Sequence, residues 1–157
     1  MKSAIVYYSS SGNTKKVADF LAEHLRQKGE VEIIPLQAEE SDNFFLQAAK
    51  AFSHQKTEVK AVNFNLKDFD LLCFGTPVWA FAPAPAMNFY LERCFGLETK
   101  KIILFCTYGS GVGKDRCLDY MQKILASKGA KEFRRFAICG KEASNKDFVL
   151  KEILSLF

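Results

Sequence analysis

The chain has 157 residues, of which 48% are hydrophobic and 25% are charged. This length and composition are typical of one soluble globular domain, spanning residues 1–157. The longest apolar runs have only the length of strands, which excludes a transmembrane helix and a membrane partner. Because residues 1–3 lead directly into the first apolar run, we expect no signal peptide and a cytoplasmic location.

The net charge of +4 is unevenly distributed along the chain. Residues 1–98 contain 10 basic and 12 acidic side chains, whereas residues 99–157 contain 12 and 6. The basic surplus fits either a solvated face of the last helices or a docking surface for an acidic partner or anionic substrate. The basic residues are scattered and no aromatic-basic motif accompanies them, so we expect no nucleic-acid partner.

Strand-like and helix-like segments alternate along the chain. Their order predicts the α/β class: a doubly wound, five-stranded parallel sheet with right-handed crossovers and strand order 2-1-3-4-5. The weakest stretch, 57–67, is interpreted as an extended connection into the third strand. Apolar runs predict strands at 4–8, 31–35, 70–75, 101–107 and 133–139, and apolar positions with helical spacing predict helices around 17–25, 41–54, 87–94, 117–125 and 148–156.

The five cysteines form no C-x-x-C pair and their number is odd. These spacings fit neither a disulfide framework nor a zinc site, so we expect five free thiols and no bound metal. The two histidines, His24 and His54, lie on predicted helices away from the loops discussed next. We therefore expect them to be structural or solvated, and we predict no catalytic acid or base.

Ligands of a doubly wound sheet bind beyond the carboxyl ends of its strands, near the point where the strand order reverses. The loop after the first strand lacks the lysine of a Walker A motif and is not G-x-G-x-x-G. Its hydroxyls and backbone N–H groups precede a helix, which suits a monoester phosphate, although a serine-rich helix cap would look similar. The predicted phosphate-binding residues are Ser9, Ser10, Ser11, Gly12, Asn13 and Thr14.

The loops after the third and fourth strands each carry an aromatic residue. The first of these, 75–85, contains the single tryptophan and three of the four prolines, and a stiff loop of this kind suits stacking on a flat ring. The alternative is that Trp79 only covers the end of the sheet. The second loop, 107–113, has three glycines that let backbone approach a ligand. The predicted ring-binding residues are Thr76, Pro77, Val78, Trp79, Ala80 and Phe81 on the first loop and Thr107, Tyr108, Gly109, Gly111 and Gly113 on the second.

These loops resemble those of the flavodoxin family over essentially the whole chain. Residues 9–14 match the family's phosphate motif S/T-x-S/T-G-x-T, and residues 70–79 resemble its third strand and flavin loop. Tyr108 stands where a second flavin-stacking aromatic is expected. The resemblance implies non-covalently bound FMN and a role as an electron carrier for a redox partner protein. It leaves open whether Trp79 or Phe81 contacts the flavin ring, and it indicates nothing about the oligomeric state.

The chain departs from typical flavodoxins, which are strongly acidic, by its basic character. Residues 76–85 and 107–113 contain no Asp or Glu, and Lys114 follows directly. Because carboxylates repel a reduced, anionic flavin, their absence predicts a reduced flavin that is less strongly reducing than in acidic flavodoxins. The same features favour an alternative function, an NAD(P)H-dependent quinone or flavin reductase. A third interpretation, a domain that has lost FMN, conflicts with the intact phosphate motif.

Overall fold

The structure is a computed structural model that describes residues 1–37 and 62–157. The predicted helix at 41–54 and the first part of the predicted connection at 57–67 lie outside these residues. The described elements are β1 (Lys2–Tyr7), α1 (Asn13–Arg26), β2 (Glu30–Pro35), β3 (Leu71–Trp79), β4 (Ala82–Pro83), α3 (Pro85–Arg93), β5 (Lys101–Tyr108), α4 (Lys114–Ser127), β6 (Glu132–Cys139), the 3-10 turn η1 (Gly140–Glu142) and α5 (Lys146–Leu154).

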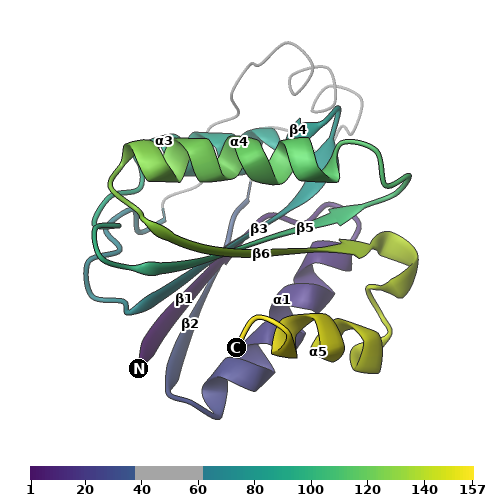
Figure 1. Ribbon diagram of the computed structural model, residues 1–157, viewed down its shortest axis with the longest axis horizontal. Coiled ribbons are helices and arrows are strands. Elements are labelled where there is room, and N and C mark those ends of the chain that lie inside the picture. Colours follow the sequence, from purple (N-terminus) through teal and green to yellow (C-terminus); the bar gives the residue numbers. More distant parts are fainter. Residues whose placement is uncertain (38–61) are drawn as a thin grey trace.

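The main sheet has the order β2-β1-β3-β5-β6, and all four pairings along it are parallel. This confirms the predicted doubly wound order 2-1-3-4-5, with β5 and β6 as the fourth and fifth parallel strands. Helices α1 and α5 cover one face of the sheet and α3 and α4 cover the other (Figure 1). All the strand ends that carry the predicted loops therefore lie at one edge.

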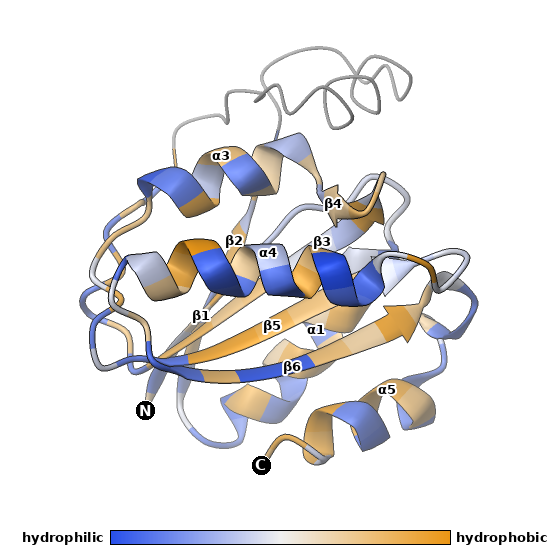
Figure 2. Ribbon diagram, turned by 45° about the horizontal axis from the view of Figure 1, so that its top comes forward, coloured by the Kyte–Doolittle hydropathy of each residue, from blue (hydrophilic) through white to orange (hydrophobic). Residues whose placement is uncertain are grey.

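The core has two halves because side chains alternate across the sheet. In β1, Ala4 and Val6 belong to the cluster packed against α3 and α4, whereas Ile5 and Tyr7 belong to the cluster packed against α1 and α5. Figure 2 shows the same separation, with β5 hydrophobic along most of its length and α4 and α5 alternating between hydrophobic and hydrophilic residues. This burial on both faces explains the continuous apolar runs of the strands.

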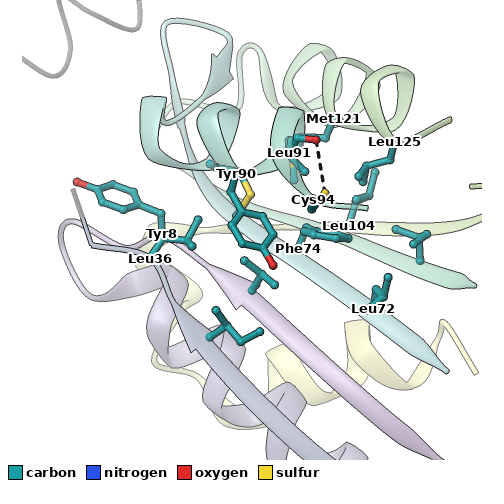
Figure 3. Packing of buried hydrophobic residues seen from close by; sticks show 14 of the residues in the cluster. Tyr8, Leu36, Leu72, Phe74, Tyr90, Leu91, Cys94, Leu104, Met121 and Leu125 are labelled. Atoms are coloured by element: carbon teal, nitrogen blue, oxygen red, sulfur yellow. Dashed lines mark hydrogen bonds between the residues drawn. The ribbon is translucent and has the colours of Figure 1, made fainter. Parts of the chain in front are cut away.

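Aromatic residues fill the α3 side of the core (Figure 3). The ring of Tyr90 on α3 lies 6.4 Å from that of Phe74 on β3, centroid to centroid, and its hydroxyl donates to the carbonyl of Asn63 at 2.7 Å. Cys94, directly after α3, donates its thiol to the carbonyl of Leu91. Burial raises the pKa of the Cys94 thiol to about 12, so this cysteine stays protonated.

All five cysteines are free thiols, as predicted. Within the described residues there is no group of His, Cys, Asp and Glu side chains that could hold a metal ion. None of the helices described is both long and apolar enough to cross a membrane.

The prediction that β3 ends at Gly75 is wrong, because the strand continues to Trp79 and turns back into β4. Pro77 has no backbone N–H and cannot donate to a neighbouring strand, which made a loop the natural expectation. The structure accommodates it because the pairing of β3 with β1 stops at Gly75, while Pro77 stays in register with Thr107 of β5. Pro77 therefore lies where β3 is still paired with β5 but no longer with β1.

His24 predicts a pH dependence of stability. Its ring lies 5.1 Å from that of Phe157, and its buried Nε2 has no hydrogen-bond partner among the described residues. Burial, and then the charge of Lys28, lower the pKa of His24 in the folded chain. The unfolded chain, with a pKa of about 6.5, therefore binds the proton first, and the free energy of unfolding falls as the pH drops below about 6.5.

Urea unfolding of the wild type and of His24→Gln, measured at several pH values, isolates this contribution from that of the other histidine. The difference in unfolding free energy between the two proteins should shift in favour of His24→Gln as the pH falls below the pKa of the unfolded histidine. A difference that is the same on both sides of that pKa would contradict it.

Candidate functional site

The three predicted loops meet at the carboxyl edge of the sheet. A hydrogen bond of 2.8 Å joins the side-chain hydroxyls of Thr14 and Thr107, both buried, and ties the first loop to the third. The second and third loops touch where Phe81 packs against Gly113. The backbone of β3 and β5 holds these loops side by side, since Pro77 and Thr107 are paired in register.

The first loop presents backbone donors at the start of α1. Gly12 has a φ of 88° and caps the helix, with its N–H donating to Ser9 Oγ at 3.1 Å and its carbonyl accepting from Lys16 N–H. Within the described residues, the N–H groups of Ser10, Ser11 and Asn13 have no acceptor. Free N–H groups at a helix N-terminus attract an anion, so the loop fits a phosphate.

The two lysines that follow the first loop make their contacts away from it. Lys15 pairs with Asp19 one turn along α1 at 2.6 Å, and Lys16 donates to Ser144 Oγ at 2.8 Å. The loop would thus hold an anion through backbone hydrogen bonds and the helix dipole. Asn13 turns toward the end of β6, where its Nδ2 would lie 2.9 Å from a Cβ at Gly140, so a side chain at Gly140 would disturb the cradle.

The second loop is a tight β-hairpin. Trp79 pairs with Ala82 across a two-residue turn, and the two residues between them, Ala80 and Phe81, have φ values of 47° and 67°. Both central residues of a type I′ turn need positive φ, which usually selects glycine or asparagine. The hydroxyl of Thr76 fixes the base of the hairpin by accepting from Ala84 N–H at 3.0 Å and donating to the carbonyl of Pro77.

The two aromatic residues of this hairpin have different surroundings. Trp79 is 9% exposed and belongs to the core cluster, and its ring lies 5.8 Å from that of Tyr8 in an edge-to-face arrangement at 87°. Phe81 is 47% exposed. A cavity of about 180 Å³ opens between the hairpin and the third loop, and it is lined by Val78, Ala80, Phe81, Tyr108, Gly109, Ser110 and Val112.

The third loop places a cation beside this cavity. Lys114 Nζ lies 5.1 Å from the centroid of the Tyr108 ring, within the range of a cation–π contact. A Cβ on Gly109 would meet nothing within 4 Å, whereas one on Gly113 would lie 2.4 Å from Phe81 Cδ1. Gly109 thus leaves open space beside the tyrosine ring, and Gly113 lets the hairpin approach.

Three contributors to this edge were absent from the predicted residues. Ser110 and Val112 line the cavity, and Gly140 allows the end of β6 to approach Asn13. Ser110 and Val112 lie in the third loop, which was predicted from its glycines and Tyr108. The position of Gly140 directly after the fifth strand, at the same edge, was the available signal for it.

The edge as a whole combines an anion cradle with an adjoining aromatic cavity. The residues of loops 76–81 and 107–113 carry no charge, and among the described residues that line the cavity only Tyr108 has a titratable side chain. The donor set fits FMN, because the free N–H groups suit its phosphate and the space beside Phe81 and Tyr108 suits its ring. The arrangement offers binding and electrostatic tuning, with the redox chemistry left to a bound cofactor.

Comparison with known proteins identifies the family of the chain. The sequence model of the family described as NADPH-dependent FMN reductase matches residues 1–144. No curated protein sequence matches the chain.

Solved structures share the fold at low sequence identity. A flavoprotein in complex with FMN from Lactobacillus acidophilus has a TM-score of 0.64 at 17% identity, covering 93% of this chain and 98% of its own. The apo form of an NADH:FMN oxidoreductase reaches 0.63 at 17% identity, covering 99% and 90%. Oxidised flavodoxin 1 from Bacillus cereus reaches 0.59 at 18% identity, with full coverage of both chains.

Proposed function

We propose, since this chain belongs to the NADPH-dependent FMN reductase family, that it holds FMN at the carboxyl edge of its sheet and reduces it with NADPH or NADH. The observation that carries the proposal is the juxtaposition of the backbone N–H groups of Ser10, Ser11 and Asn13, which have no acceptor among the described residues, with a cavity walled by Phe81 and Tyr108. The first feature suits the phosphate of FMN and the second its isoalloxazine ring. The family membership favours the predicted alternative, a reductase, over the predicted electron carrier.

Each loop has a separate task in this proposal. Residues 9–14 hold the phosphate through N–H groups that the helix dipole makes more positive. Phe81 and Tyr108 sandwich or flank the ring, and the hydroxyl pair of Thr14 and Thr107 keeps the phosphate cradle and the ring cavity at a fixed separation. Val78 and Val112 add apolar surface that excludes water from the ring.

Bound FMN supplies the chemistry by accepting a hydride, which is two electrons and one proton, from the reduced nicotinamide. The chain assists this through electrostatics. NADPH carries several negative charges, and the absence of Asp and Glu from residues 76–85 and 107–113 removes repulsion against them. The start of α4, with Lys114 and Arg116 against Asp115, adds a net positive charge at the same edge.

The electron-carrier function remains the second candidate, and one observation favours it. The hairpin tip lies directly over the third loop, with Phe81 Cα only 3.0 Å from where a Cβ of Gly113 would be. Such a covered ring would leave little surface for stacking a nicotinamide and would favour electron transfer through its exposed edge to a protein partner.

The reaction with reduced nicotinamides separates the two functions. The FMN-loaded protein is mixed anaerobically with NADPH, and with NADH, and the flavin absorbance is followed. Bleaching without an added reductase, followed by return of the absorbance on adding a quinone or free FMN, is the result we expect. A flavin that neither nucleotide bleaches, but that a flavodoxin reductase does, would assign the carrier function instead.

The contact between Lys114 and Tyr108 predicts a shift in the reduction potential. Lys114→Gln removes a positive charge beside the ring cavity and should make reduction of bound FMN harder by about 1 kcal/mol, which is about 20 mV for a two-electron couple. Lys123→Gln, an exposed change on the same helix, is the charge-matched control. Spectroelectrochemical titration of both variants tests this, and equal potentials would contradict it.

A further inference from the structure

A second cavity, of about 500 Å³, lies at the opposite edge of the sheet from the proposed FMN site. Its floor is formed by buried residues near the amino ends of two neighbouring strands, Leu71 of β3 and Ile103 of β5, which both belong to the α1 and α5 half of the core. Cavities of a few hundred cubic ångströms with an apolar floor and a few polar groups are typical of small-molecule sites. The volume exceeds that beside Tyr108.

One wall of this cavity is aromatic. The C-terminus lies beside α1 (Figure 1), and the ring of the last residue, Phe157, contacts two residues from that part of the chain. Lys28 Nζ lies 3.8 Å from the centroid of the Phe157 ring, and the ring of His24 lies 5.1 Å from it. The half-exposed Phe157 ring thus contacts both residues and also lines the cavity.

The rim of the cavity has a surplus of positive charge. Two acidic residues, Asp70 and Glu132, line it. The cationic lining residues number four: Lys28, Lys100, Lys101 and Arg134. Asp70 accepts the backbone N–H of Lys2 at 2.7 Å, and Glu132 is the register partner of Lys101 on the neighbouring strand. Asp70 thus already accepts one hydrogen bond, and Glu132 stands beside a lysine in the sheet register.

Arg134 stands out among these cations. Lys100 donates to the carbonyl of Lys67 at 2.7 Å, and Lys28 faces the Phe157 ring. In the described part of the chain Arg134 has no acidic or carbonyl partner, whereas its neighbour Arg135 pairs with Asp119. Its register partner is Ile103 on the cavity floor, and Arg134 itself lines the cavity. A planar guanidinium binds carboxylate, sulfonate or phosphate oxygens through two parallel hydrogen bonds.

We infer that this cavity is a second ligand site, which binds a small organic anion with an apolar body. Leu71, Ile103 and the Phe157 ring would contact the apolar part, and Arg134, assisted by Lys101, would bind the anionic group. The charge surplus at this edge gives a specific role to part of the basic character of residues 99–157. The site lies away from the FMN loops, so ligand binding here does not depend on the reductase function.

The fluorescent anion 8-anilinonaphthalene-1-sulfonate is a suitable probe, since it joins a sulfonate to an apolar aromatic body. It is titrated into the wild type, with and without saturating FMN, so that binding at the FMN loops is recognised by competition. Arg134→Gln should weaken the FMN-independent binding roughly tenfold, the loss of one charge-assisted contact. Lys101→Gln should weaken it less, and Lys123→Gln, on the far helix α4, should leave it unchanged.

The neutral N-phenyl-1-naphthylamine, which lacks the sulfonate, should bind more weakly and should not respond to Arg134→Gln. Equal binding of the anionic probe to Arg134→Gln and Lys123→Gln would overturn the inference, as would binding that FMN abolishes or an absence of binding to the wild type. Thermal unfolding of each variant checks that it is folded. Backbone amide NMR shifts confined to residues 101–103 and 134 would locate the probe independently.

Discussion

Replacing Trp79 by alanine should lower the free energy of unfolding by about 3–5 kcal/mol, the range for removing a large aromatic side chain from a core. Trp79 is buried and makes an edge-to-face contact with Tyr8 within the α3 and α4 half of the core. The same substitution at Phe81, which is about half exposed, should change stability by less than about 1 kcal/mol. Alanine keeps the Cβ at this positive-φ position, so the turn itself is not further strained.

FMN affinity should follow the opposite order. Phe81→Ala removes an aromatic wall of the cavity beside Tyr108 and should weaken FMN binding by about 1–3 kcal/mol, the scale of base–aromatic stacking. Urea unfolding of the FMN-free proteins and flavin-fluorescence titrations measure the two quantities separately. If Trp79→Ala instead weakens FMN binding by that amount with stability unchanged, Trp79 is the ring wall that the sequence also allowed.

The parallel core of the fold was predictable because its signals are local. Each strand buried on both faces reads as a continuous apolar run, and the order of alternating elements leaves few topologies. The first loop was predictable for the same reason, since a phosphate cradle at a helix N-terminus is built from consecutive residues. The role of residues 9–14 as a phosphate motif could therefore be predicted from those residues alone.

The second loop was less predictable because its conformation depends on partners distant in sequence. The turn at Ala80 and Phe81 adopts positive φ without glycine or asparagine, and nothing local signals that choice. The hairpin is supported instead by the hydroxyl of Thr76 and by the space left at Gly113. The burial of Trp79 against Tyr8 is likewise a tertiary contact. These tertiary contacts decide which of the two aromatic residues borders the cavity, so the sequence left that choice open.

Two glycines test the phosphate cradle, since Gly12 and Gly113 occupy equivalent positions. They precede α1 and α4 with φ values of 88° and 87°. A left-handed alanine costs about 1–2 kcal/mol at either position. A Cβ on Gly12 meets nothing within 4 Å, whereas one on Gly113 overlaps Phe81. Gly113→Ala should therefore destabilise the FMN-free protein by about 1–3 kcal/mol more than Gly12→Ala.

For FMN binding, Gly12→Ala should have the more specific effect. Its methyl group would occupy the open space of the cradle and displace the phosphate from one or two N–H groups, which weakens FMN binding by about 1.5–3 kcal/mol, or roughly tenfold to a hundredfold. Riboflavin, which has the same ring but no phosphate, should bind Gly12→Ala and wild type equally well. Gly113→Ala, which moves Phe81, should weaken both ligands alike. A loss at Gly12 that is equal for FMN and riboflavin would mean that residues 9–14 do not hold the phosphate, because only the phosphate distinguishes the two ligands.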